Sequence, residues 1–205
     1  MEFNNYLMEQ VRLITQSPMM KLEDIPKVEL YMEQLLQFFE QEMGEVLLYA
    51  DKGEKIFTKT MINNYTKEGA LPRPNNKKYG EIHMVMLAYI SMLKRILSIS
   101  QIRDFFALAG NKEDLTTLYR AYAEMIDEYR DEYVRLTEER MERIEKRLAE
   151  HHIEDDKLKA MTFISLMGVE AAVNQTVCGK LLEAYQKENM DKEEAESRPE
   201  GREEK

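Results

Sequence analysis

Lysine, threonine and asparagine side chains recur along the segment TKTMINNYTK, residues 58–67, at spacings that a helix would gather on one face. At about 100° per residue, Met61, Ile62 and Tyr65 fall on the other side and would pack inward. Asparagine can form two hydrogen bonds with adenine, and lysine reaches phosphate or guanine, so this face has the chemistry to bind a nucleic acid. The polar face consists of Lys59, Thr60, Asn63 and Lys67, with Asn64 at its edge.

A basic loop follows in the segment ALPRPNNKKY, residues 70–79. Gly69 suits the left-handed residue that ends a helix, and Pro72 and Pro74 prevent the helix from continuing. The cations of the loop would lie along a phosphate backbone, where they position a protein without reading bases. The two segments together predict these DNA-binding residues: Thr58, Lys59, Thr60, Asn63, Asn64, Lys67, Arg73, Asn76, Lys77, Lys78 and Tyr79.

A short helix, a helix with a polar face and a basic loop together form the pattern of a winged helix-turn-helix. The charge distribution agrees, because residues 52–103 contain ten basic and three acidic residues in a chain of formal net charge −10. The positive segment would attract a polyanion, while the acidic remainder would keep the chain soluble. On spacing alone, an ordinary helix followed by a surface loop is an equal alternative.

Two longer segments carry a resemblance to known regulators. IFTKTMINNYTKEGALPRPNNKKY and EIHMVMLAYISMLKRILSISQI resemble MerR-type proteins, in which a recognition helix ends at a glycine and a wing ends at a tyrosine. Gly69 and Tyr79 take those places here, and residues 97–102 would begin the last helix of the module. With IPKVELYMEQLL added, residues 22–110 resemble more closely a bacterial family, domain of unknown function 1836. The resemblance implies DNA-binding transcriptional regulation.

One position departs from the MerR pattern. The Arg-Tyr-Tyr of the MerR recognition helix corresponds here to Asn63, Asn64 and Tyr65, so only the last residue is kept. The phosphate contacts of the first two positions therefore do not transfer to this chain. Lys59 and Lys67 would supply such contacts instead.

The positions that carry this chemistry need helices to hold them, and apolar residues recur at spacings of three and four along most of the chain. With only 8 glycines and 5 prolines in 205 residues, the sequence predicts an all-α fold. A small wing is the one place where short strands could form. Helices are expected over 3–15, from Asp24 to a turn at 51–53, and then over 58–68, 81–97, 98–110, 112–152 and 156–187.

Four regions follow from this order of elements. Residues 1–22 would hold an N-terminal helix, and 23–110 a MerR-like winged helix-turn-helix DNA-binding domain. Residues 111–190 would form a helical dimerisation or effector region, in which two long helices pair antiparallel. Residues 191–205 contain no apolar side chain larger than alanine and would be a disordered acidic tail.

The last helix predicts a homodimer. Between residues 160 and 179 its only charged residue is Glu170, and a helix that is apolar nearly all round is buried on most sides. One chain offers too few partners to bury it, so a second copy is expected there, with Glu170, Asn174 and Gln175 pairing across the interface. A tyrosine stripe on the preceding helix would either pack internally or line a pocket for an unknown small-molecule effector: Tyr119, Tyr122, Tyr129 and Tyr133.

Signatures of catalysis are absent. The sequence contains no P-loop, no dinucleotide-binding glycine motif and no zinc-type Cys/His spacing, so we expect no enzyme, no metal and no cofactor. Cys178 is the single cysteine, which rules out an internal disulfide. No apolar run is long enough to span a membrane, and the N-terminus does not resemble a signal peptide, so we expect a cytoplasmic protein.

The function that these features favour is sequence-specific binding of double-stranded DNA by a dimeric transcriptional regulator. The alternative is a non-catalytic protein-interaction module that kept the winged helix fold. In that case the polar face of residues 59–67 would hold an acidic protein partner.

Overall fold

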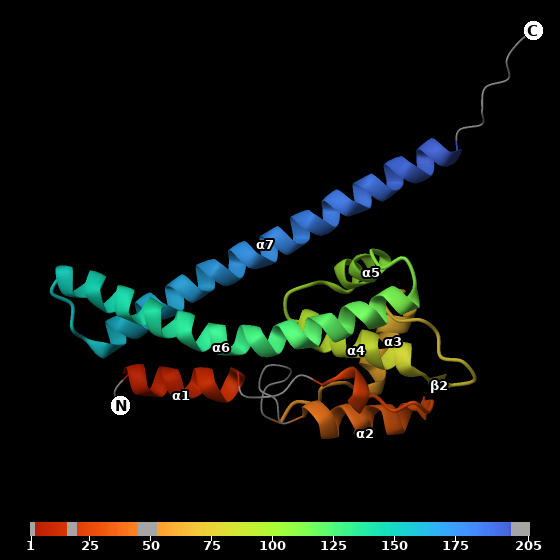
Figure 1. Ribbon diagram of the computed structural model, residues 1–205, viewed down its shortest axis with the longest axis horizontal. Helices are drawn as coiled ribbons and strands as arrows, with labels where there is room; N and C mark the ends of the chain where they lie inside the picture. The colour runs from red at the N-terminus through yellow and green to blue at the C-terminus, as the bar shows by residue number, and fades with distance from the viewer. Residues whose placement is uncertain (1–2, 16–19, 45–52, 198–205) are drawn as a thin grey trace, which may run out of the picture.

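Helices dominate the computed structural model, which describes residues 3–15, 20–44 and 53–197, with side chains up to Asp191 (Figure 1). The expected helical character is confirmed, and a two-stranded sheet accompanies it. In the part of the chain that the structure describes, no helix has the length and apolar character needed to cross a membrane. The elements are α1 (Phe3–Thr15), η1 (Leu22–Asp24), β1 (Leu30–Tyr31), α2 (Met32–Met43), α3 (Lys59–Lys67), β2 (Lys78–Tyr79), α4 (Glu81–Leu93), α5 (Ile99–Ala107), α6 (Lys112–Glu150) and α7 (Asp156–Ser197).

The small sheet joins the start of α2 to the loop that precedes α4. β1 and β2 run antiparallel, with Leu30 opposite Tyr79 and Tyr31 opposite Lys78. The chain reverses between Asn75 and Lys78, where the Lys78 amide donates to the Asn75 carbonyl over 2.8 Å. Both central residues of this turn have positive φ, 48° and 64°, as a type I′ turn requires.

The first hydrophobic core surrounds α4, whose residues 83–91 are all buried. Leu35 and Phe39 of α2 and Ile62 and Tyr65 of α3 pack into it. The first turns of α6 belong to the same core. α5 and α6 contribute Ile102, Phe106, Leu115, Tyr119 and Ala123.

A second core lies at the far end of the molecule, where α6 turns into α7 (Figure 1). α1 packs against it: the Phe3 ring meets the Phe163 ring edge-on at 6.3 Å, and Asn4 Nδ2 donates to Glu145 Oε1 over 2.7 Å. The N-terminal helix is therefore an integral part of this end of the structure. The buried residues of this core are Met141, Ile144, Leu148 and Phe163.

α7 separates from α6 after the second core and crosses toward α5 (Figure 1). Gln175 Nε2 donates to the Ile96 carbonyl over 2.9 Å, and Leu182 is buried in the first core. The two long helices thus pair antiparallel near their shared turn and not along their whole lengths. This divergence leaves much of the α7 surface exposed.

The helix expected from Asp24 begins later, at Met32. Pairing with β2 holds residues 30–31 extended, and the Tyr31 amide donates to Gln34 Oε1 over 2.9 Å, which starts the helix at the next residue. Asp24 instead ends η1, where its carboxylate accepts from the Lys21 amide over 2.8 Å.

The end of α7 also differs from the expectation. The helix continues to Ser197, so the segment 191–197 is helical and the disordered tail does not begin at 191. Glutamate, lysine and alanine dominate this segment and have high helix propensity, which outweighs its lack of apolar side chains. Residues 198–205 and the first two residues of the turn expected at 51–53 lie outside the described residues.

Two glycines allow a matched test of the backbone. Gly69 has φ of +77°, so Gly69→Ala should lower the free energy of unfolding by about 1–2 kcal/mol. Gly168 lies inside α7 with open space around it, so Gly168→Ala should raise the free energy of unfolding by about 0.5–1 kcal/mol. Urea unfolding followed by circular dichroism measures both. Shifts of the same sign in the two variants would contradict this assignment.

Candidate nucleic-acid interface

α3 is fixed at both ends by local hydrogen bonds. The Thr58 hydroxyl accepts from the Met61 amide over 3.2 Å, which satisfies one of the donors at the helix N-terminus. At the other end, the Ala70 and Leu71 amides donate to the Tyr65 carbonyl over 2.9 and 3.1 Å. The expected helix start and the expected glycine end are both confirmed.

The buried side of α3 is the apolar side, as the spacing predicts. Ile62 and Tyr65 are buried, and the Tyr65 ring meets the Phe57 ring edge-on at 6.4 Å. Phe57 in turn meets Phe39 of α2 at 5.1 Å. This chain of rings fixes the rotation of α3 about its axis, so the opposite side has to face outward.

The outward side of α3 carries the predicted polar residues. The side chains gathered there border an open hollow of about 510 Å³, which is within the size range of ligand sites but opens widely to solvent. A continuous hydrogen-bonding surface is therefore available to a partner that approaches from outside. Its exposed residues are Lys59, Thr60, Asn63, Asn64 and Lys67, with Thr58 and Met61 half-buried at the edge.

The hairpin of residues 73–79 presents a second set of polar groups. Arg73, Asn76 and Lys77 are exposed, and the positive φ of Asn76 and Lys77 places them at the tip of the type I′ turn. Lys78 is half-buried, with its Nζ 5.4 Å from the centre of the Tyr31 ring. This cation–π contact holds the Lys78 ammonium group against its own chain.

Tyr79 does not belong to the exposed set. Its side chain is 4% exposed and packs edge-on against His83 at 5.4 Å, and burial raises the pKa of the Tyr79 hydroxyl. The expectation that Tyr79 contacts DNA is therefore corrected: pairing with Leu30 turns its side chain into the core. Thr58 is likewise a capping residue, since its hydroxyl oxygen already accepts from Met61.

His83 lies behind the hairpin and is buried. Its Nδ1 accepts from the Gly80 amide over 3.2 Å, and desolvation by burial lowers the pKa of the imidazole. The buried ring thus supports the start of α4.

Several basic side chains of residues 52–103 are engaged within the protein. Lys94 Nζ donates to the Ile56 carbonyl over 2.7 Å, and burial lowers the pKa of Lys94. Arg103 pairs with Asp104 at 3.0 Å. Lys59 lies 3.9 Å from Glu33 of α2, a distance at which the attraction between exposed groups is weak. On α3 and the hairpin, Lys67, Arg73 and Lys77 are exposed.

The connection between α2 and α3 is long. Residues 44–58 separate the two helices, whereas the helices of a helix-turn-helix are usually joined by three or four residues. Phe57 at the end of this connection supplies the ring contacts that hold α3 against α2. The Phe57 ring thus contacts both helices.

The four tyrosines of the proposed effector stripe do not share one site. Tyr119 is fully buried, its hydroxyl donates to the Met20 carbonyl over 2.6 Å, and its ring packs 5.3 Å from Tyr89. Tyr122 stacks on Tyr89 at 5.5 Å. Tyr119 is therefore a core residue, which corrects its assignment to an effector pocket or interface, and Tyr122 is half-buried against the same core. Tyr129 and Tyr133, 5.9 Å apart, lie further along α6 toward α7.

The residues expected to pair across a dimer interface have different positions. Gln175 is exposed, and its Nε2 donates to the Ile96 carbonyl of its own chain. Asn174 is exposed, and Glu170 pairs with Arg140 of α6 at 2.8 Å. All three side chains lie where a partner could reach them.

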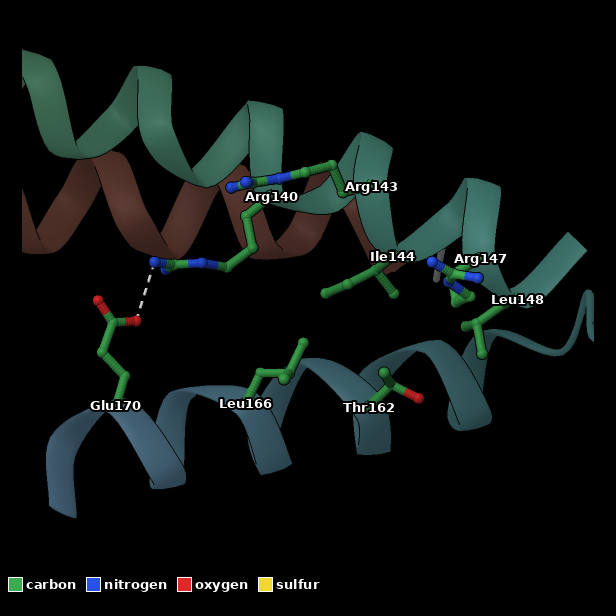
Figure 2. Close-up of a pocket in the computed structure, with 8 residues that line it drawn as sticks. All are labelled: Arg140, Arg143, Ile144, Arg147, Leu148, Thr162, Leu166 and Glu170. Carbon is green, nitrogen blue, oxygen red and sulfur yellow. Dashed lines mark ion pairs between the residues drawn. The ribbon is translucent and has the colours of Figure 1, made fainter. Parts of the chain in front are cut away.

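A pocket beside Glu170 was missed from the sequence (Figure 2). It has a volume of about 470 Å³ between α6 and α7 and is bordered by Ile144, Leu148 and Leu166 on its apolar side. The signal that could have found it is a set of arginines at spacings of three and four on α6, because such residues share one helix face. They are Arg140, Arg143 and Arg147.

A family match covers the candidate interface. The family model described as Domain of unknown function (DUF1836) matches residues 20–126. No curated protein and no solved structure matches the chain. Among the described residues, no group of three or more His, Cys, Asp or Glu side chains is arranged to hold a metal ion.

Burial of His83 predicts a pH dependence of stability. Because the pKa of His83 is lowered below its ordinary value of 6.5 in the folded chain, the unfolded chain takes up this proton more readily. The contribution of His83 to the free energy of unfolding is fully present above pH 6.5. It is lost as the pH falls from 6.5 through the lowered pKa that His83 has in the folded chain. His83→Gln keeps an acceptor for the Gly80 amide and removes the titration.

Urea unfolding midpoints at pH 7.5 and pH 5.5 should therefore differ more in the parent chain than in His83→Gln. All other titrating groups are shared, so the difference between the two proteins isolates His83. An identical pH dependence would show that the imidazole is not buried as described.

Proposed function

We propose that this chain, which belongs to the family of the domain of unknown function DUF1836, is a sequence-specific DNA-binding transcriptional regulator that acts as a dimer. The observation that carries the proposal is the exposed polar face of α3, with the basic hairpin in the same module. An apolar ring contact on the opposite side holds that face outward. A helix presented in this way suits the major groove of DNA.

A winged helix-turn-helix of the MerR type accounts for the order of elements. α2 would be the first helix, α3 the recognition helix and the hairpin of residues 73–79 the wing. Two features support this assignment: α3 ends at Gly69 with positive φ, and the hairpin ends at Tyr79 in a strand paired with Leu30.

The polar residues would divide their roles by position. Asn63 and Thr60, near the middle of the α3 face, would contact base edges, and asparagine pairs best with adenine. Lys67, Arg73 and Lys77 would bind phosphates on either side of the groove, where they set the register of the protein. In this arrangement α3 determines which sequence is bound and the hairpin increases affinity for all sequences.

A dimer would double the site. One module contacts a short stretch of DNA, and two modules related by a twofold axis would contact two half-sites of an inverted repeat. The exposed apolar surface of α7 supports a dimeric state, because monomeric proteins rarely expose large contiguous apolar patches.

A second candidate is a protein-interaction module that binds an acidic partner. Two observations favour it: Glu33 approaches Lys59 at the edge of the α3 face, and the α2–α3 connection is longer than a helix-turn-helix turn. In this case the same lysines would bind carboxylates, and no DNA sequence would be preferred.

Selection from a random pool of duplex DNA separates the two candidates. The regulator should enrich an inverted repeat, and footprinting of that sequence should show two protected half-sites. With roughly four phosphate contacts per protomer, a dimer should show a log–log salt slope of about −7. If no sequence is enriched over the starting pool, the regulator proposal fails.

Two alanine variants test the division of roles. Asn63→Ala should reduce binding to the selected sequence by about 1–3 kcal/mol and relax the preference at one base pair. Lys77→Ala should weaken binding to every sequence alike and reduce the salt slope by about 1. Fluorescence anisotropy with the selected and a scrambled duplex measures both effects.

Lys157→Ala serves as the matched control, because Lys157 is exposed at the start of α7 and outside the proposed interface. It should bind both duplexes as the parent chain does. Equal losses for Asn63→Ala and Lys77→Ala on both duplexes would contradict the assigned roles.

A further inference from the structure

One face of α7 is apolar and exposed. The residues of this face follow one another at spacings of three and four, and each is between 47% and 63% exposed. Three of them are valines, which lose little side-chain freedom when a surface covers them. The face consists of Leu166, Val169, Val173, Val177 and Leu181.

The apolar face is symmetric about position 175. If a second α7 runs in the opposite direction with its own position 175 at the same level, Val173 lies opposite Val177. Val169 then lies opposite Leu181. Apolar residues thus meet apolar residues at each of these levels, so the face is complementary to an antiparallel copy of itself.

The charges on and beside this face match the same arrangement. Glu170 and Lys180 occupy mirror positions about 175, so each would lie opposite a residue of the other sign. Glu188 mirrors Thr162, which borders the pocket between α6 and α7. Three arginines lie at that pocket: Arg140 pairs with Glu170 at 2.8 Å (Figure 2), Arg147 pairs with Glu150 at 3.0 Å, and Arg143 adds a further positive charge. An acidic residue arriving at the pocket would therefore meet a positive field.

We infer that a second copy of this chain packs on α7, with the two α7 helices antiparallel and centred near residue 175. Val173 and Val177 of both copies form the centre of the interface. Glu188 of each copy reaches the arginine pocket of the other copy, beside Arg143 and Arg147. This deepens the proposed function, since it names the surface that pairs the two DNA-binding modules.

The contact is long enough for a stable dimer. The overlap of residues 162–188 spans roughly 40 Å of helix, with a helix width of about 10–12 Å. Two helices in contact over that length, with the pocket added, bury on the order of 800 Å² per copy, which is the usual size of a specific interface. The shared spacing of three and four residues suits two helices that cross at about 20°.

Cysteine cross-linking tests the orientation. Leu166 and Ala184 are both exposed on α7 and lie at mirror positions about 175. In an antiparallel pair, a chain with Leu166→Cys and a chain with Ala184→Cys should form a disulfide when mixed, while neither should when alone. Two copies of residue 166 would be about 27 Å apart. All chains carry Cys178→Ser, which removes the native thiol.

A parallel pair would give the reverse result, because each single-cysteine chain would then cross-link to itself. That outcome, or a disulfide in none of the samples, would overturn the inference. Non-reducing gel electrophoresis after mild oxidation reads the result.

The apolar centre is tested by Val173→Asp, which places a carboxylate in the interface without touching either core. The dimer dissociation constant should rise about 100-fold or more. Ile164→Asp is the matched control, because Ile164 is 67% exposed on a different side of α7 and should leave dimerisation unchanged. Sedimentation equilibrium measures the constants, and circular dichroism checks that each variant is folded.

The charge contact is tested by a swap. Arg143→Glu and Glu188→Arg should each weaken the dimer on the order of 10-fold, and the double variant should recover most of the loss. Additive losses in the double variant would show that the two side chains do not meet. A parent chain that sediments as a monomer of 24.3 kDa at micromolar concentration would exclude the interface altogether.

These measurements contain no DNA, so they separate the interface from the proposed function. A dimer that selects no DNA sequence would end the regulator proposal and leave the interface standing. A monomer that still selects a single half-site would do the reverse.

Discussion

The burial of residues 83–91 of α4 is the constraint on which the rest of the structure depends. Its residues 83–91 are buried on every side, which requires neighbours all around the helix. Tyr89 shows how this is achieved: its ring lies 5.3 Å from Tyr119 and 5.5 Å from Phe105 and Tyr122, so α4, α5 and α6 meet on one side chain. Desolvation there raises the pKa of Tyr89 to about 12. The first turns of α6 thus pack as part of this core, and the family match ends just beyond them, at residue 126.

The candidate interface follows from that core. α3 and the hairpin each give one side to it, through Tyr65 and Tyr79, and present their polar side chains outward. Because local caps fix the ends of α3 and strand pairing fixes the hairpin, the exposed groups are held before any partner arrives. Such pre-organisation lowers the entropy lost on binding. It serves a DNA duplex and an acidic protein equally, which is why sequence preference and not affinity distinguishes the two proposals.

α7, in contrast, exposes apolar side chains. Near the turn at 151–155 it packs on α6 and α1, and near Leu182 it touches the first core, but between these contacts its apolar face is about half exposed among the residues that the structure describes. The ion pair between Arg140 and Glu170 marks the level at which α7 leaves α6 (Figure 2). A second copy would cover the exposed apolar face of α7. The two α7 helices would then join the two modules.

The sequence by itself determined most of the helices, the glycine that ends α3 and the buried side of that helix. These features depend on neighbours three or four residues away, which is the range that periodicity and capping report. Only the tertiary structure decided that Tyr79 and Tyr119 are core residues, that α2 starts at Met32, and that three arginines form a pocket with α7. Each of these depends on contacts between residues far apart in the chain, such as Leu30 with Tyr79 and Arg140 with Glu170, and no local pattern encodes them.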